Sequence, residues 1–204
     1  MAGSWESDPQ KTPRSGGGRR GNPWRIALWG GAVVLLLLPL VAMQVSNDVQ
    51  WGPLDFTVAG TLLFGTALAF ELAVRKSGSV AYRLGAGLAL AAAFLLIWIN
   101  LAVGIIGDEG EQANLLYLGV LAVGIGGALL ARFEPGGMAR AMVLAAAVAV
   151  VGVVALAAGW GATGPRWPMD VALLTVFFAA LFGGSAWLFR QAAREKILGA
   201  GPAG

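Results

Sequence analysis

The sequence predicts an all-α integral membrane protein, a bundle of six transmembrane helices. Its 204 residues are 57% apolar and only 12% charged, whereas an average soluble domain has about 25% charged residues. The apolar residues form six runs of roughly the 20 residues that cross a bilayer core of about 30 Å. The basic residues gather in short segments between these runs. A bilayer explains this segregation better than a soluble surface does.

The six expected spans divide the chain into a membrane domain, residues 25–190, and two tails. The spans are Ile26–Val45, Leu54–Val74, Leu84–Ile106, Asn114–Ala131, Met138–Trp160 and Met169–Phe189. Residues 1–24 are rich in Gly, Ser, Pro and charge, so we expect a disordered cytoplasmic tail. Residues 191–204 form a second cytoplasmic tail. The connectors are short and contain the turn formers Gly, Pro, Asn and Asp.

The Lys and Arg residues predict the orientation of the six spans. With six crossings, 13 of the 14 basic residues fall on one side, and only Arg166 falls on the other. Basic loops stay in the cytoplasm, so both termini are predicted there. The acidic connector with Asp108, Glu109 and Glu111 is then outside. Arg exceeds Lys, and Ala and Gly are abundant, which favours a bacterial origin and the inner membrane.

A regular spacing suggests three helix-hairpin repeats. Arg25, Arg83 and Arg140 each open an odd-numbered span, at intervals of 58 and 57 residues. Fixed-period similarity is typical of repeats, and two-helix units would be related by an axis along the membrane normal. The alternative is that hairpins with basic inner ends show this period without internal homology. Asp55, Asn114 and Asp170, which open the even spans, are then ordinary helix caps.

Stripes of small residues predict where the helices approach closely, because small side chains let helix backbones come together in lipid. Residues of this kind recur every fourth position in the third and fifth spans and cluster in the fourth. They are Ala81, Gly85, Ala89 and Ala93; Ala141, Ala145 and Ala149; and Gly124, Gly126 and Gly127.

Two polar residues at membrane depth are candidate site residues. Glu71 lies one helical turn inside Arg75, and this spacing lets the arginine pair with the carboxylate. Ionisable groups inside a membrane are costly and often functional, so Glu71 is either a structural ion pair with Arg75 or a proton- or cation-binding carboxylate. Asn100, in the third span, is expected to hydrogen-bond a neighbouring helix.

The chain has no Cys and no His. This composition excludes disulfides, thiolate or imidazole metal ligands and cysteine nucleophiles. It also removes the commonest general base near neutral pH. We therefore predict no catalytic, cofactor or metal site, and no enzymatic activity. Because the basic residues lie between apolar runs rather than over one surface, nucleic-acid binding is not expected.

Several short segments resemble those of a known group of proteins. They are Phe94–Gly107, Asn114–Tyr117 and Ala69–Ala73. These segments are similar to those of small, uncharacterised multi-pass proteins of the bacterial inner membrane. The resemblance covers roughly residues 50–190. It implies a multi-pass membrane fold and supplies no catalytic or binding residues.

Two functions remain open at the level of the sequence. The first is a structural or accessory membrane protein that contacts the lipid bilayer and a membrane-protein partner or further copies of itself. The shortage of charges inside the spans and the small-residue faces favour it. The second is a small-solute or ion transporter or channel in which Glu71 is the coupling carboxylate.

Overall fold

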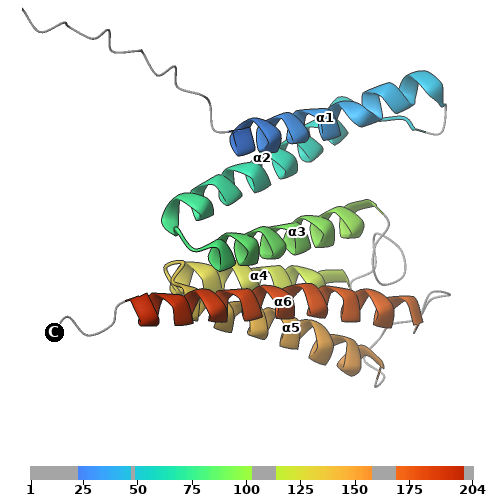
Figure 1. Ribbon diagram of the computed structural model, residues 1–204. Helices are drawn as coiled ribbons and strands as arrows, with labels where there is room; N and C mark the ends of the chain where they lie inside the picture. The colour runs from blue at the N-terminus through green and yellow to red at the C-terminus, as the bar shows by residue number, and fades with distance from the viewer. Residues whose placement is uncertain (1–22, 47–48, 103–113, 158–168, 200–204) are drawn as a thin grey trace, which may run out of the picture.

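The computed structural model is all-helical in the part of the chain that it describes, residues 23–46, 49–102, 114–157 and 169–199. Six helices run roughly side by side (Figure 1). They are α1 (Pro23–Val45), α2 (Pro53–Lys76), α3 (Val80–Ala102), α4 (Leu115–Leu130), α5 (Pro135–Ala157) and α6 (Met169–Gly199). The acidic connector, Arg166 and most of the N-terminal tail lie outside the described residues.

Five of these helices are long and apolar enough to cross a membrane, which indicates a multi-pass membrane protein. The exception is α4, whose 16 residues extend about 24 Å at 1.5 Å per residue. A bilayer core is about 30 Å thick. Five of the six expected spans are therefore long and apolar enough to cross, and the sixth span is not confirmed.

The order of packing differs from the order of the chain. α6 packs against both α3 and α5, and α5 packs against α4, so α3 to α6 form a four-helix group. α2 packs on α3, and α1 packs on α2, so the first hairpin extends from one side of this group (Figure 1). Only Ala32 is buried among the α1 residues described for burial.

The three hairpins are not packed alike. α3 and α4 touch little, whereas α4 and α5, which belong to different expected repeats, pack closely. At this contact an added Cβ on Gly127 would lie 2.6 Å from the Cβ of Ala141. The threefold repeat is not confirmed, because its second unit lacks the internal contact that the third unit has.

Small residues make most of the predicted close contacts. The α5 residues Ala141, Ala145 and Ala149 are buried, as are Ala81, Gly85 and Ala89 of α3. At the α3–α6 contact the hydroxyl of Ser185 donates to the carbonyl oxygen of Gly85 at 2.8 Å. The prediction was wrong for Gly126, whose added Cβ would meet nothing within 4 Å.

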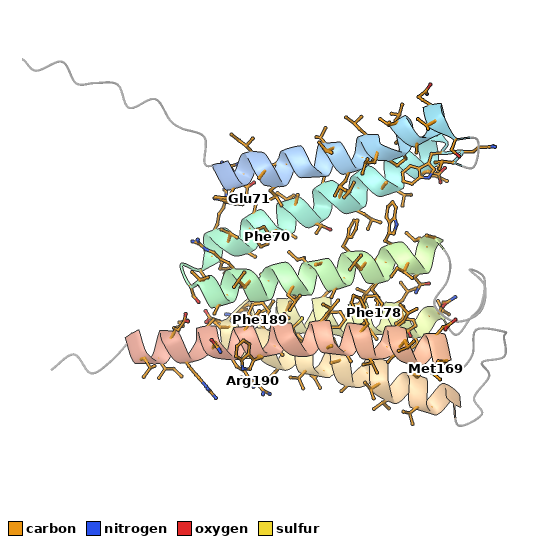
Figure 2. All side chains as sticks on the ribbon, turned by 45° about the vertical axis from the view of Figure 1, so that its right-hand side comes forward. Phe70, Glu71, Met169, Phe178, Phe189 and Arg190 are labelled. Carbon is orange, nitrogen blue, oxygen red and sulfur yellow. The ribbon has the colours of Figure 1, made fainter. Side chains whose placement is uncertain are left out.

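The basic residues gather at one end of the helices, which we call the basic end. In the described chain this end holds nine Lys and Arg residues and three glutamates. They are Arg25, Arg75, Lys76, Arg83, Arg132, Arg140, Arg190, Arg194 and Lys196, with Glu71, Glu134 and Glu195. Asp55 and Asp170 open helices at the opposite end. Figure 2 shows Glu71 and Arg190 toward one end and Met169 at the other.

α6 continues ten residues beyond the expected end of its span at Phe189, so much of the expected C-terminal tail is helical. Two polar contacts hold this extension. The Nζ of Lys196 donates to Glu134 at 2.6 Å, and the hydroxyl of Ser79 donates to Glu195 at 2.6 Å. Hydropathy does not register such an extension, because half of residues 190–199 are charged or polar and their partners are distant in sequence.

Candidate functional site

Glu71 lies in a cluster that joins α1 to α2 near the basic end. Its side chain accepts a hydrogen bond from the Nε1 of Trp29 at 2.9 Å on one carboxylate oxygen. The other oxygen contacts the Nη2 of Arg25 at 2.7 Å and is also bonded by Arg75. We call these four residues the Glu71 cluster. Both oxygens of the carboxylate therefore have donors.

The Glu71 carboxylate is buried although its cationic partners are not. Glu71 is 3% exposed, while the side chains of Arg25 and Arg75 are 49% and 62% exposed. This is the arrangement expected of arginines whose stems lie along apolar surface and whose guanidinium groups reach the interface. The ring of Trp29 stacks on Phe64 with centroids 6.1 Å apart, which adds an apolar contact between the same two helices.

The geometry of the Glu71 cluster suits a clasp between helices better than an ion-binding site. A coupling carboxylate needs an oxygen that a proton or cation can reach along a path, whereas both oxygens here meet fixed donors. Two arginines already neutralise the single negative charge. Glu71 lines neither the apolar cavities beside α1 and α3 nor the cavity between α3 and α4.

Asn100 is the second residue that the sequence singled out, and it lies far from Glu71. Its Nδ2 donates to the backbone oxygen of Asn114, which opens α4, at 3.3 Å. Asn100 is 20 residues into α3 from the basic end, whereas Glu71 is five residues from the end of α2. At 1.5 Å per residue the two are separated by about 20 Å along the bundle. They do not form one site.

Two partners of Glu71, Arg25 and Trp29, were not recognised from the sequence. They are four residues apart on α1, so they share one helix face. An antiparallel hairpin places that face beside the last turns of α2. A search for donors on the first helix at the depth of Glu71 would have found both.

The part of the chain that the structure describes contains no cluster of acidic residues suited to a metal ion. Within the same residues, every buried side-chain nitrogen or oxygen has a hydrogen-bond partner. For example, the hydroxyls of Tyr117 and Thr175 lie 3.0 Å apart, and Thr175 also donates to the carbonyl of Val171. The Tyr117–Thr175 contact joins α4 to α6.

An apolar groove lies over α2, between α1 and α3, and we call it the α1–α3 groove. It consists of two adjoining cavities of about 550 and 560 Å³. They share the lining residues Leu35, Leu63, Phe94 and Leu95. On α1 the groove runs from Ala27 to Ala42, about 22 Å, and so covers most of a bilayer core.

A third cavity, of about 360 Å³, lies between α3 and α4, and we call it the α3–α4 cavity. It occupies the seam where these two helices touch little, and α2, α5 and α6 close it from the other sides. Its walls are almost entirely apolar. Residues along it include Ala69, Tyr82, Ala86, Ala89, Val120, Leu129, Phe133, Met142 and Phe182.

The turn between α4 and α5 closes the basic end of this cavity and has an unusual backbone. Arg132 and Phe133 have φ angles of 50° and 61°, a left-handed conformation that costs a non-glycine residue roughly 1–2 kcal/mol. Two other helices hold the turn. The Nζ of Lys76 donates to the carbonyl oxygen of Arg132 at 3.0 Å, and the hydroxyl of Tyr82 donates to the carbonyl oxygen of Phe133 at 2.9 Å.

Glu134, the next residue of this turn, lies outside the apolar helices. Its hydrogen bond from Lys196 holds the pKa of the Glu134 carboxyl below its usual value, and the nearby charge of Lys76 acts in the same direction. The pair joins the turn to the end of α6.

Comparisons with protein-family models, with curated proteins and with solved structures give no match. The resemblance to small bacterial inner-membrane proteins stays a prediction.

Proposed function

We propose that this protein is an accessory subunit of a membrane complex, and that its α1–α3 groove holds a transmembrane helix of a partner protein. The groove is the observation that carries this proposal. It is apolar, it extends along most of the bilayer thickness, and α1 and α3 form its two walls. A single helix of a partner, laid along α2, matches this shape.

The residues that line the groove favour a helix as its occupant. In the half nearer the basic end the lining includes Gly31, Ala32, Ala67, Gly87 and Ala91. Small residues allow a second backbone to come close, and close packing replaces the hydrophobic effect as the driving force inside a membrane. The Glu71 cluster supports the same function, because it fixes α1 against α2 and so sets the width of the groove.

We also propose that α4 is a sixth span, with both termini in the cytoplasm of a bacterial cell. The two ends of the α4 segment bond to the two ends of α3, through Asn114 to Asn100 and through Phe133 to Tyr82. Residues 82 to 100 of a helix extend about 27 Å. The α4 segment, with its end turns, covers the same distance, which is close to a bilayer core.

Single-cysteine photo-crosslinking tests the groove, because the natural chain has no cysteine. Ala91→Cys places a benzophenone label inside the groove. The matched control, Val176→Cys, places it on α6, where Val176 is 66% exposed. We expect the groove label, in native membranes, to attach to a transmembrane segment of one partner protein, mapped by mass spectrometry, and the control label not to.

A blocking variant gives the second arm of the test. Ala91→Trp should abolish co-purification of the partner in mild detergent, whereas Val176→Trp should leave it unchanged. The proposal is wrong if the chain purifies without a partner. It is also wrong if both labels attach to the same proteins, or if the groove label attaches only to another copy of this chain.

A further inference from the structure

The α3–α4 cavity is shorter along the helices than the α1–α3 groove. On α3 it is lined from Tyr82 to Ala93, which is about 17 Å. It therefore begins at the basic end and stops near the middle of the bundle. Half of a bilayer core of about 30 Å is one leaflet. The cavity is thus as deep as one leaflet, the depth that a lipid acyl chain occupies.

The cavity also communicates with the outer surface of the bundle. Its lining includes Ile125 and Leu129 of α4, which are 56% and 59% exposed. An acyl chain has a lateral route into it from the bilayer. The lining consists of apolar residues and Gly124, and the hydroxyl of Tyr82, its one polar side-chain group, is engaged by the α4–α5 turn. Such walls match a hydrocarbon chain.

Basic groups stand at the end of the cavity where a lipid headgroup would lie. Phe133 lines the cavity, and the Nζ of Lys76 is 5.1 Å from the centre of its ring. Arg132, the preceding residue, is exposed. The acidic residue nearest in the chain, Glu134, is bonded to Lys196. A headgroup here meets positive charge, at an end of the bundle where basic residues outnumber acidic ones.

The backbone at this end is held in a costly shape. Strained residues persist only where surrounding contacts fix them, and they cluster at binding sites. Here Lys76 and Tyr82 fix Arg132 and Phe133 in the left-handed conformation. The turn thereby keeps Phe133 at the cavity and Arg132 beside Lys76.

We infer that the α3–α4 cavity is a binding site for one anionic phospholipid of the leaflet at the basic end. An acyl chain occupies the cavity, and the headgroup phosphate contacts Lys76 and Arg132. Basic pockets between transmembrane helices bind anionic headgroups in this way. The site meets the α1–α3 groove only at Leu90, which lines both, and it does not depend on a partner protein.

The affinity for an anionic lipid tests the charge at the mouth. The full chain in mild detergent is titrated with phosphatidylglycerol and with phosphatidylcholine, and retained lipid is counted by native mass spectrometry. We expect one phosphatidylglycerol to bind and phosphatidylcholine to bind at least tenfold more weakly. Lys76→Gln with Arg132→Gln should weaken phosphatidylglycerol about 30-fold, since each basic contact contributes about fivefold.

The matched control removes the same charge at the same end without touching the cavity. Arg140→Gln with Arg194→Gln changes two exposed residues that do not line it. This control should bind phosphatidylglycerol as the natural chain does. Equal binding of the two lipids, or equal losses in both double variants, would overturn the inference, because only general attraction to a basic surface would then remain.

Filling the cavity tests the chain-binding part without altering charge. Ala89→Leu adds three carbons inside the cavity, and Ala91→Leu adds the same carbons in the α1–α3 groove. We expect the first to lower retention of phosphatidylglycerol at least tenfold and the second to leave it unchanged. Circular dichroism melting of each variant without lipid identifies a folding defect. Full retention by a folded Ala89→Leu variant would also overturn the inference.

Discussion

Replacing Gly127 with alanine tests how closely α4 and α5 approach. An added Cβ on Gly127 would lie 2.6 Å from the Cβ and 3.2 Å from the Cα of Ala141. Carbon atoms in favourable contact are about 3.5–4.0 Å apart, so the two helices must separate by about 1 Å. The neighbouring Gly126 has no atom within 4 Å of an added Cβ. We therefore expect the same substitution to have opposite effects on stability at the two glycines.

The expected magnitudes follow from overpacking and helix propensity. Inserting a methyl group into a packed contact costs about 1–3 kcal/mol, reduced by the 0.5–1 kcal/mol or so that alanine gains over glycine in a helix. The net cost is then about 0–2.5 kcal/mol. At roughly 2–4 °C per kcal/mol for a chain of this size, Gly127→Ala should lower the melting temperature by up to about 10 °C. Gly126→Ala should raise it by about 1–4 °C.

The assay is thermal unfolding in one detergent, followed by circular dichroism, for both variants and a double variant. Gly127→Ala with Ala141→Gly removes the Cβ that causes the closest contact, so it should recover most of the loss. The reasoning about close approach is refuted if Gly127→Ala stabilises the protein as Gly126→Ala does. It is also refuted if Ala141→Gly adds a further loss instead of recovery.

Two further predictions concern charged pairs near the basic end. Glu71→Gln removes the charge that holds Arg25, so α1 should separate from α2. Cross-linking between cysteines introduced at Leu28 and Ala67, both of which line the α1–α3 groove, should fall at least fivefold relative to the same cysteine pair with Glu71 intact. Unchanged cross-linking would contradict the clasp. The lowered pKa of Glu134 means that its stabilisation is complete above the usual value of 4.5 and is lost as pH falls through the lower folded value. The melting temperature should therefore decrease as the pH is lowered from about 4.5, and Lys196→Gln should flatten this part of the pH profile. If the variant and the natural chain have identical profiles, the Glu134–Lys196 pair does not contribute to stability.

The sequence predicted the fold class because it depends on local properties. Runs of apolar residues identify the helices, and their lengths agree with the described helices to within a few residues at most ends. The stripes of small residues on α3 and α5 were also predicted correctly, since a spacing of four residues places them on one helix face. The end of α6 was not, because the contacts of Glu195 and Lys196 with distant residues determine it.

The partners of Glu71 show where sequence reasoning was incomplete. The spacing to Arg75 is visible along one helix, but the contacts with Arg25 and Trp29 span 46 and 42 residues of the chain. They form only because α1 and α2 lie antiparallel. The Glu71 cluster therefore depends on which helix faces which, and a single sequence does not contain that information directly.

The amino-acid sequence by itself determined that this chain forms apolar helices, where most of them begin and end, and at which end the basic residues gather. These features follow from the polarity and size of residues close together in the chain. Only the tertiary structure decided that α6 packs between α3 and α5, and that α3 and α4 leave a cavity between them. The physical reason is that the packing of two apolar helices depends on the shapes of both surfaces, and hydropathy does not distinguish one apolar surface from another.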